Sequence, residues 1–484
     1  MADTVEHSQA STIAATRDDE PLRRIPVASL DDVWRRRNRY YYGQVHQYFK
    51  RHIPPGASVL EIGCGSGELL ADLGPSRGVG VESDSRLAER ARRTHPELEI
   101  IRSGYDSLSL DETFDYVVLA NTLGEMHDVQ ATMAAVRSVC RPDTRVVIAY
   151  LNALWEPLLA LASMLHVRRR VQAQNWLSTD DIRNLLRLAD LEPVALSSEL
   201  LLPTYVPLLS TFLNRCATRV WPFSNLSLVS ILVARPTCWP ISSGKPSCSV
   251  VVPTHNERGN IADVIRRTPK MGSRTELIFV DGDSDDGTAD EIQRLIADSD
   301  STDIKLVHQG TRGGKGDAVR KGFAVATGDV LMILDADLTV PPEDLPKFYD
   351  ALVSGKGEFI NGTRLVYPLE NRAMPFLNKC ANKSFSLIFS YLLNQRFRDT
   401  LCGTKVLRRT DYERIAAGRS YFGRSDPFGD FDLIFGAARN NLRILEIPVR
   451  YAARTYGATS IRRFRDGLLL LRMSWIALCK LKMR

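Results

Sequence analysis

Apolar and polar positions follow one another along the chain in a pattern typical of α/β proteins. Short apolar runs stop at glycine-rich or acidic turns, and the segments after these turns have the amphipathic spacing of helices. Repeated strand–turn–helix units predict largely parallel sheets with helices on both faces, that is, doubly wound α/β domains. We predict the strands that carry candidate chemistry at 58–62, 78–81, 114–119, 144–150, 249–252, 276–280 and 330–334.

The residue composition of the chain changes between two predicted strands near its middle. A β-like run ends at Val233 and the next apolar run begins at Ser249, and three prolines, two adjacent serines and Gly244 lie between them. Such a composition is typical of a linker. A chain of 484 residues is also longer than one hydrophobic core usually accommodates. We therefore predict a flexible tail at 1–26, a first domain at 27–236, a linker at 237–246, a second domain at 247–461 and an amphipathic C-terminal helix at 462–484.

Composition narrows the class of protein. Hydrophobic residues make up 44% and charged residues 25% of the chain, which fits a folded globular protein rather than a disordered one. The eight cysteines are scattered, without CxxC pairs or the histidine spacing of zinc sites. They therefore predict reduced thiols, as in the cytoplasm, and neither disulfides nor zinc.

Basic residues gather in four clusters, although the net charge is only +6. No nucleic-acid-binding motif accompanies them, so we predict no nucleic-acid partner. Two interpretations stay open for the clusters, an ordinary solvated surface or a contact with anionic lipid headgroups. They lie at Arg35–Arg37, Arg168–Arg170, Arg462–Arg465 and Lys480–Arg484.

Three longer apolar stretches are too short to span a bilayer, which takes about 18–20 uninterrupted apolar residues. Two of them, Leu154–Val167 and Leu200–Leu213, are predicted to be buried core helices. The third, Gly467–Leu478, contains Arg472 and Trp475 and precedes a basic end, which predicts a helix that lies on a membrane. Because no signal-peptide pattern is present, we expect a cytoplasmic protein that associates peripherally with the inner face of the membrane.

A glycine-rich turn, Gly63–Gly67, follows the first predicted strand. Glycines there let the backbone approach a ligand closely and direct amide hydrogens at it. The next predicted strand ends at Glu82, 19 residues after Gly63. An acid at this spacing is positioned to accept both hydroxyls of a ribose. The two features together predict a site for a nucleotide-like cofactor.

With the strands that follow, these motifs resemble a class I S-adenosylmethionine-dependent methyltransferase over residues 45–236. The resemblance implies a Rossmann-like fold and S-adenosylmethionine as cofactor. It places the methionine part at the glycine loop, the ribose at Glu82, the adenine beside Tyr105 or Asp106, and the methyl group near the segment that begins at Asn121. The implied cofactor-binding residues are Glu61, Gly63, Gly65, Gly67, Glu82, Tyr105, Asp106 and Asn121.

In the second half, polar turns follow two predicted parallel strands. Thr254–Glu257 ends the first of them, and Asp281 and Asp283 follow the second. Acids at the carboxyl ends of adjacent parallel strands mark the crevice where nucleotides bind, although a solvated turn is also rich in aspartate and glycine.

A third apolar run ends in Asp335-Ala336-Asp337. On an extended chain, two carboxylates two positions apart point to the same side. Hard oxygen ligands of this kind suit Mg²⁺ or Mn²⁺, with a diphosphate completing the coordination shell. The pair therefore predicts a divalent metal that neutralises charge as a nucleoside diphosphate leaves.

The ordered motifs VVPTHNE, VDGDSDDGT, GGKGDAVRKG and DAD resemble a family 2 glycosyltransferase of the GT-A fold over residues 247–460. Segments downstream, including 361–364, 378–382 and 454–457, resemble the dolichol- or polyprenyl-phosphate sugar synthase branch, which transfers a sugar from a nucleotide donor to a lipid phosphate. The implied residues for the nucleotide sugar are Pro253, Thr254, Asn256, Glu257, Asp281, Asp283, Lys315 and Asp335, and those for the metal are Asp335 and Asp337.

A lipid-phosphate acceptor is already anionic, so it needs cations to hold it more than a base to deprotonate it. Arg364, Lys379 and Arg454 are candidates, and a surface salt bridge is the alternative for each. If the acceptor is a hydroxyl, Asp399 and either Asp430 or Asp432 are candidate bases. The candidate catalytic residues are Asp337, Arg364, Lys379, Asp399, Asp430 and Arg454.

The sequence thus favours a membrane-associated bifunctional enzyme. We expect it to move a sugar from a nucleotide donor to a polyprenyl phosphate or other lipid-linked acceptor, and to methylate the same glycolipid or its neighbour. The alternative is an active glycosyltransferase whose methyltransferase-like half has become a binding or regulatory module. Glu125 and His127 are open to acid–base or structural roles, so the methyl acceptor stays open, as do the sugar and the oligomeric state.

Overall fold

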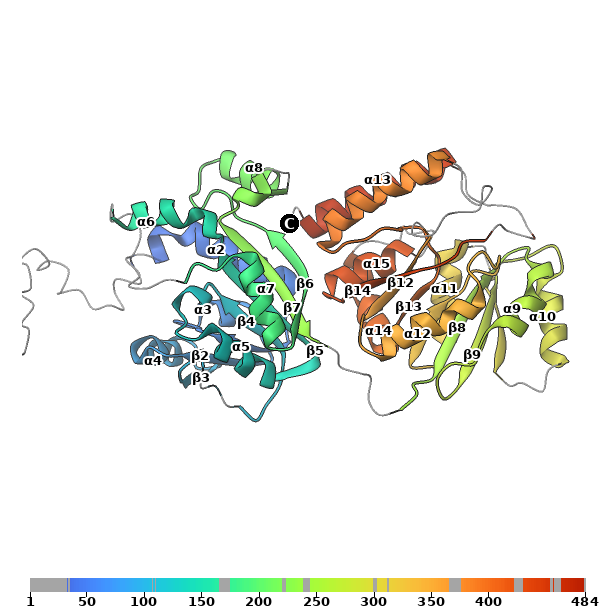
Figure 1. The fold of residues 1–484 in the computed structure, drawn as a ribbon, viewed down its shortest axis with the longest axis horizontal. Coiled ribbons are helices and arrows are strands. Elements are labelled where there is room, and N and C mark those ends of the chain that lie inside the picture. The colour runs from blue at the N-terminus through green and yellow to red at the C-terminus, as the bar shows by residue number, and fades with distance from the viewer. Residues whose placement is uncertain are drawn as a thin grey trace, which may run out of the picture.

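The computed structural model describes residues 33, 35–106, 108, 110–164, 175–219, 223–237, 244–298, 303–310, 313–364, 376–421, 430–452, 456 and 463–482. These residues form two seven-stranded sheets with helices packed on both faces, and the two units lie side by side (Figure 1). The predicted pair of doubly wound α/β domains is confirmed. The predicted tail at 1–26 and most of the predicted linker lie outside the described residues.

The first sheet has the strand order β3-β2-β1-β4-β5-β7-β6. The five strands from β3 to β5 are parallel, and β7 runs antiparallel to β5 and β6. The strand order reverses between β1 and β4, which is where doubly wound folds bind ligands. The strands are β1 (Ser58–Ile62), β2 (Arg77–Glu82), β3 (Glu99–Arg102), β4 (Phe114–Ala120), β5 (Cys140–Leu151), β6 (Leu191–Ser198) and β7 (Val229–Pro236).

Alternate side chains of these strands face opposite sides of the sheet, so each face has its own core. Val59 and Val118 pack with helices α2 to α4, while Leu60 and Val117 pack with α5 and α7. Helices α6 and α8 lie at the edge of this unit that is uppermost in Figure 1. The helices are α2 (Arg39–His52), α3 (Glu68–Asp72), α4 (Ser85–Thr94), α5 (Val129–Ser138), α6 (Glu156–Met164), α7 (Thr179–Leu188) and α8 (Leu209–Arg215), with short 3₁₀ turns η2 (Leu123–Glu125), η3 (Ala153–Trp155), η4 (Ala217–Arg219) and η5 (Phe223–Leu226).

The second sheet has the order β10-β9-β8-β11-β13-β12-β14. Strand β13 is antiparallel to β11 and β12, and the remaining neighbours are parallel. The strand order reverses between β8 and β11, which is again the position where doubly wound folds bind ligands. The strands are β8 (Cys248–Thr254), β9 (Thr275–Asp281), β10 (Ile304–His308), β11 (Val330–Ile333), β12 (Phe359–Thr363), β13 (Lys405–Arg408) and β14 (Ile444–Pro448).

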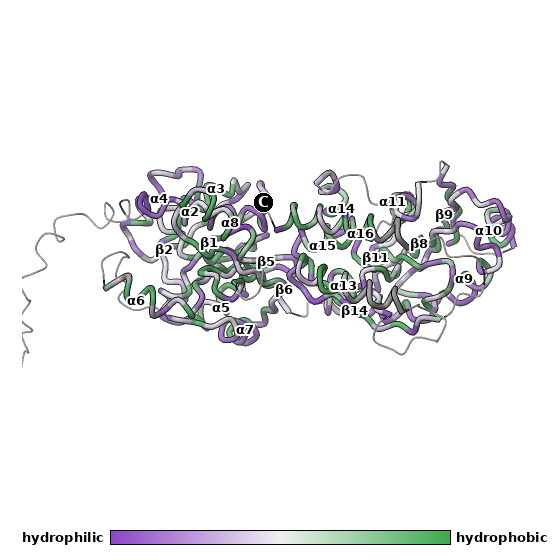
Figure 2. The backbone as a smooth tube through the Cα atoms, turned by 90° about the horizontal axis from the view of Figure 1, so that it is seen from above, coloured by the Kyte–Doolittle hydropathy of each residue, from purple (hydrophilic) through white to green (hydrophobic). Residues whose placement is uncertain are grey.

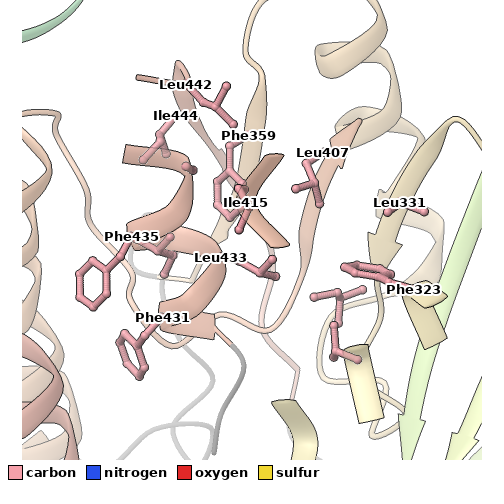
Figure 3. Packing of buried hydrophobic residues seen from close by; sticks show 14 of the residues in the cluster. Phe323, Leu331, Phe359, Leu407, Ile415, Phe431, Leu433, Phe435, Leu442 and Ile444 are labelled. Atoms are coloured by element: carbon pink, nitrogen blue, oxygen red, sulfur yellow. The ribbon is translucent and has the colours of Figure 1, made fainter. Parts of the chain in front are cut away.

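Two hydrophobic cores hold the second sheet between its helices. Phe359, Leu407 and Leu331 of the sheet belong to the same core as Ile415, Phe323 and the aromatic residues of α15 (Figure 3). Figure 2 shows that the outer helix α10 is mainly hydrophilic, as expected for a helix that covers such a core. The helices are α9 (Ile261–Arg267), α10 (Thr288–Ala297), α11 (Gly314–Val325), α12 (Leu345–Val353), α13 (Phe376–Leu393), α14 (Arg409–Ala417), α15 (Asp430–Arg439) and α16 (Arg463–Ala477), with short turns η6 (Arg258–Asn260), η7 (Pro342–Asp344), η8 (Arg419–Tyr421) and the π-helical η9 (Leu478–Lys482).

The prediction that the first two long apolar stretches form core helices is wrong. The described part of the first stretch includes α6, where only Leu159 packs against the core and Leu158 and Leu161 are exposed. In the second stretch Leu200 is buried, but Leu209 and Phe212 of α8 are exposed. Hydrophobicity predicted a helix-forming segment correctly but not which way its apolar face points, because that depends on the packing of other elements.

Among the helices that the structure describes, none is long and apolar enough to cross a bilayer.

A buried ion pair joins the two units. The Nη2 atom of Arg145 in β5 donates hydrogen bonds to both carboxylate oxygens of Glu358, at 2.7 and 2.8 Å. Both side chains are almost completely buried. The Nε of Arg145 also donates to the carbonyl oxygen of Asn441, at 2.8 Å. Burial alone would raise the pKa of Glu358, but Arg145 and Arg235 outweigh it and hold that pKa below its usual value.

Two further contacts extend this junction. Arg235 of β7 donates to the carbonyl oxygen of Gly355 at 2.7 Å, and its guanidinium lies 3.6 Å from Glu358. His52 at the end of α2 and Asn441 lie within hydrogen-bond distance at 3.1 Å, and burial lowers the pKa of this histidine. The junction therefore combines side chains from the first sheet and α2 with the segment before β12 and the loop before β14.

We predict that Arg145→Ala lowers the free energy of unfolding by about 3–5 kcal/mol, because it leaves Glu358 charged, buried and short of its main partner. The matched control is Arg77→Ala, which removes exposed ion pairs with Glu99 and Glu112 and should cost about 0–1 kcal/mol. Urea denaturation of the full chain measures both. Equal stability of the two variants would contradict a structural role for the junction.

Candidate functional site

The cofactor loop of the first unit lies at the carboxyl end of β1. Gly63, Gly65 and Gly67 all have left-handed backbones, with φ values of 73°, 56° and 79°. A Cβ atom on Gly63 would overlap the methyl group of Thr122, so the loop passes close to the segment after β4. Glycine is required here by both conformation and space.

Glu82 lies beside this loop, at the end of β2. Its carboxylate accepts hydrogen bonds from the backbone N–H of Gly65 at 2.8 Å and of Asp84 at 2.9 Å, and from the hydroxyl of Tyr105 at 3.3 Å. The structure therefore brings together the glycine loop, the predicted ribose acid and Tyr105. Asp106 is adjacent in sequence but exposed, so the geometry favours Tyr105 of the two candidates.

Glu61 is the buried acid of the site. Burial raises its pKa to about 8, although Arg35 opposes that rise, and its Oε2 atom has no hydrogen-bond partner. The buried Oδ1 of Asn121 and the hydroxyl of Thr122 also have none. Polar atoms left this way cost free energy unless a ligand satisfies them. This set fits a cofactor that carries both cationic and hydrogen-bonding groups, as S-adenosylmethionine does.

Residues before and within α2 complete the site, and sequence reasoning missed them. Arg35 forms an ion pair with Glu68 at 2.7 Å, and a Cβ atom on Gly65 would lie 3.2 Å from its guanidinium. Tyr41 accepts a hydrogen bond from the Nδ2 of Asn121 at 3.0 Å. The only signal in the sequence was the basic cluster that contains Arg35, because contacts over such separations leave no local pattern.

In the second unit, the turns after β8 and β9 are tied to each other. The Oδ1 of Asn256 accepts from the backbone N–H of Asp285 at 3.0 Å, and the N–H of Glu257 donates to Thr288 at 3.0 Å. Asp281 accepts from the hydroxyl of Ser284 at 2.6 Å. The predicted nucleotide-sugar residues therefore lie together at one edge of the sheet.

These residues differ in exposure. Thr254, Glu257 and Asp281 are buried, Pro253 and Asn256 are half-buried, and Asp283 is exposed. Asn256 and Asp283 have left-handed backbones, with φ values of 57° and 62°, which asparagine and aspartate tolerate better than most residues. Such backbones often occur where loops are shaped for a ligand.

Asp335 and Asp337 lie in a turn after β11, which ends at Ile333. The predicted alignment of the two carboxylates by strand pleating is therefore wrong. Instead, Asp337 accepts hydrogen bonds from the N–H and hydroxyl of Thr339 at 3.1 and 2.8 Å, which shape the turn. The Oδ1 of Asp335 lies 2.6 Å from the Nζ of Lys315 at the start of α11.

Two residues close to Asp335 were not predicted. A Cβ atom on Gly403 would overlap the carboxylate of Asp335, so only glycine fits there. Lys405 is fully buried and donates to the carbonyl oxygen of Cys402 at 2.5 Å. Burial alone would raise the pKa of Asp335, but Lys315, Lys405 and Arg364 outweigh it and keep that pKa low. A buried lysine next to a tight glycine, in the segment CGTK, was the signal available in the sequence.

Arg364 and Asp399 form a buried bidentate pair. The Nε and Nη2 atoms of Arg364 lie 2.8 Å from the two carboxylate oxygens, and the backbone N–H of Arg364 also donates to Asp399. The guanidinium lies 5.0 Å from the ring centroid of Tyr451. Burial would lower the pKa of Arg364, but Asp399 outweighs it and raises that pKa. Asp399 is completely buried and its two carboxylate oxygens accept from Arg364, which argues against the predicted role as a base and suits a role in positioning Arg364.

The remaining catalytic candidates are not placed. The side chains of Lys379, Asp430 and Arg454 lie outside the described residues. Asp432, the alternative to Asp430, is buried and paired with Arg419 at 2.5 Å, which argues against a role as base. Among the side chains that the structure describes, no group of three or more histidine, cysteine, aspartate or glutamate residues is arranged to hold a metal. Asp335 and Asp337 offer two hard oxygen donors, which fit a metal that takes its other ligands from a diphosphate.

Comparison with known proteins agrees with this division. Residues 33–196 match the family described as a methyltransferase domain, and residues 249–415 match glycosyl transferase family 2. A solved S-adenosylmethionine-dependent methyltransferase from Thermotoga maritima, described as a possible histamine N-methyltransferase, is 16% identical, with a TM-score of 0.35; the match covers 43% of this chain and 95% of that one.

The curated relatives match the second half. A dolichol-phosphate mannosyltransferase of Pyrococcus furiosus is 28% identical over 219 residues, which are 44% of this chain and 59% of that protein. A polyprenol monophosphomannose synthase of Mycolicibacterium smegmatis is 28% identical over 218 residues, 44% of this chain and 80% of that protein. The match to a dolichol-phosphate mannosyltransferase of Saccharomyces cerevisiae, at 38% identity, spans 40% of its length. The chain therefore carries an S-adenosylmethionine-dependent methyltransferase domain and a family 2 glycosyltransferase domain related to the polyprenyl-phosphate sugar transferases.

Proposed function

We propose that this chain transfers a sugar from a nucleotide-sugar donor to a polyprenyl phosphate or another lipid-linked acceptor. We further propose that its methyltransferase half methylates the same glycolipid or a neighbour in the same pathway. The observation that carries the first proposal is the contact between Lys315 and Asp335, with an Nζ–Oδ1 distance of 2.6 Å. Lys405 and Arg364 also act to lower the pKa of Asp335. Cations stabilise a diphosphate as negative charge develops on it.

The arrangement of Arg364 supports a phosphate acceptor. Asp399 holds the guanidinium in a fixed orientation, and a phosphate monoester needs no base because it is already anionic. Asp399 and Asp432, two candidate bases for a hydroxyl acceptor, are each paired with an arginine, which favours an acceptor that needs no base. The printed names of the relatives, dolichol-phosphate and polyprenol-phosphate mannose transferases, point to the same acceptor chemistry.

Asp335 and Asp337 would hold a divalent cation, which would offset the charge of the leaving nucleoside diphosphate. The contact between Lys315 and Asp335 keeps that carboxylate ionised at neutral pH. In the first half, Glu82 and the glycine loop would bind S-adenosylmethionine, with Glu61 and Asn121 facing its charged and polar groups.

The C-terminal helix supports association with a membrane at the glycosyltransferase half. Leu468, Leu471 and Trp475 of α16 are exposed at spacings that place them on one face, and the exposed Arg472 lies among them. Such a helix lies at the interface between headgroups and acyl chains. We therefore propose a peripheral location on the inner face of the cytoplasmic membrane.

We predict that chelation of divalent cations abolishes sugar transfer by the full chain, and that added Mg²⁺ or Mn²⁺ restores it. Asp337→Asn should lower the rate by about 100-fold or more, because removing a preorganised charge from a transition state typically has that effect. Asp350→Asn is the matched control, since Asp350 is exposed on α12. Transfer that continues unchanged in EDTA would remove the metal from the mechanism.

We predict that Glu82→Ala weakens binding of S-adenosylmethionine by roughly 1.5–3 kcal/mol, the usual range for hydrogen bonds to a charged group. Glu89→Ala, at an exposed position on α4, should leave binding unchanged. Calorimetry on the full chain measures both. If the wild-type chain fails to bind the cofactor, the first half is a regulatory or binding module, and the methylation proposal is wrong.

A further inference from the structure

The methyltransferase half has an apolar surface that its own fold leaves uncovered. On α6 and the turn before it, Leu154, Leu158 and Leu161 are exposed at spacings of four and three residues, so they share one face. Another side of the same segment is anchored, because Trp155 and Leu159 pack against the hydrophobic core. This helix is therefore held in place with its apolar face directed outward.

A second group of apolar side chains lies on α8 and the segment before it. Tyr205, Leu208 and Phe212 are exposed, Leu208 to 88%. The segment is fixed in position, since the Oδ1 of Asn214 accepts hydrogen bonds from the backbone N–H groups of Leu201 and Leu202 at 2.9 and 2.8 Å. These hydrogen bonds therefore hold the apolar side chains of the segment in exposed positions.

The backbone at Leu208 is strained. Its φ of 64° lies in the left-handed region, which a bulky side chain rarely adopts. Strain of this kind costs about 1–3 kcal/mol and persists where the surrounding structure enforces it. Here it holds a leucine out in solvent, so intramolecular packing does not explain it.

The glycosyltransferase half presents a similar surface at the same edge of the molecule. Figure 1 shows α6, α8 and α13 along one edge, and α16 packs on α13. Leu387 and Tyr391 of α13 are exposed four residues apart, so they share one face of this helix. The Arg145–Glu358 ion pair joins the two halves, and the helices that carry these exposed apolar side chains lie along that edge (Figure 1).

We propose that α6 and α8 of the methyltransferase half dock on the same bilayer surface as α13 and α16. The choice of a membrane as the partner rests on the lipid acceptor proposed above. Two observations favour a membrane over a protein: the apolar side chains are spread along the length of the molecule, and exposed Arg215 and Arg472 lie among them. Apolar insertion combined with arginines at the headgroups is the chemistry of an interfacial helix, and it matches an anionic leaflet.

The test is sedimentation of the full chain with vesicles of phosphatidylcholine, with and without phosphatidylglycerol. We expect binding that is stronger to the anionic vesicles. The double variant Leu158→Asp/Leu161→Asp and the single variant Phe212→Asp should each weaken it by about tenfold or more, because each loses the burial of at least one large apolar side chain. Leu188→Asp is the matched control, an exposed leucine on α7 that is not part of this surface.

Three outcomes would overturn the proposal. The first is that the α6 and α8 variants, with unchanged melting temperatures, bind vesicles as well as the wild-type chain, while Trp475→Asp does not; only α16 would then touch the membrane. The second is that the wild-type chain binds neither kind of vesicle. The third is a dimer in sedimentation velocity without lipid that Leu158→Asp/Leu161→Asp dissociates, which would make a second copy of the chain the partner.

A separate assay distinguishes failure of this inference from failure of the proposed function. Sugar transfer by the wild-type chain to a short-chain polyprenyl phosphate in solution needs no membrane. Loss of vesicle binding in the α6 and α8 variants would support docking even if that transfer were absent. Transfer without any effect of these variants on vesicle binding would leave the enzyme assignment intact and remove the docking face.

Discussion

The buried contact between Arg145 and Glu358 determines how the two halves of this protein are related. Two charges removed from water require nearly complete compensation, and here a bidentate geometry, Arg235 and the backbone N–H of Arg443 supply it. Such a contact tolerates little displacement, unlike a junction built from side chains that can slide. In this structure the contact joins two domains that are otherwise connected by a linker.

The sequence was most informative where candidate functional residues come directly after a strand. The glycine loop, Glu82 and Asp281 were all identified from short local patterns, because the carboxyl ends of parallel strands converge in any doubly wound sheet. The fold class could be predicted for the same reason. The family resemblance added the cofactor and donor classes, which local patterns alone did not specify.

Features that depend on packing between distant elements could not be predicted. Asp399 and Arg364 are 35 positions apart, and only the structure shows that one neutralises the other. Lys405 is buried beside Asp335 although lysine usually avoids burial, and the apolar face of α6 points outward although leucine usually favours the core. Lys405 and the leucines of α6 behave against the average tendency of their residue types, which is why composition and local pattern did not predict where they lie.

The junction has a consequence for the proposed pair of reactions. If the Arg145–Glu358 contact stays formed during catalysis, the distance between the two candidate sites is constant, and a product is not handed directly from one site to the other by domain movement. A lipid that both domains modify would have to leave one site and reach the other by lateral diffusion within the leaflet. Diffusion of the lipid within the plane of the leaflet would then keep the product close to the second domain, which the fusion of the two domains alone does not do.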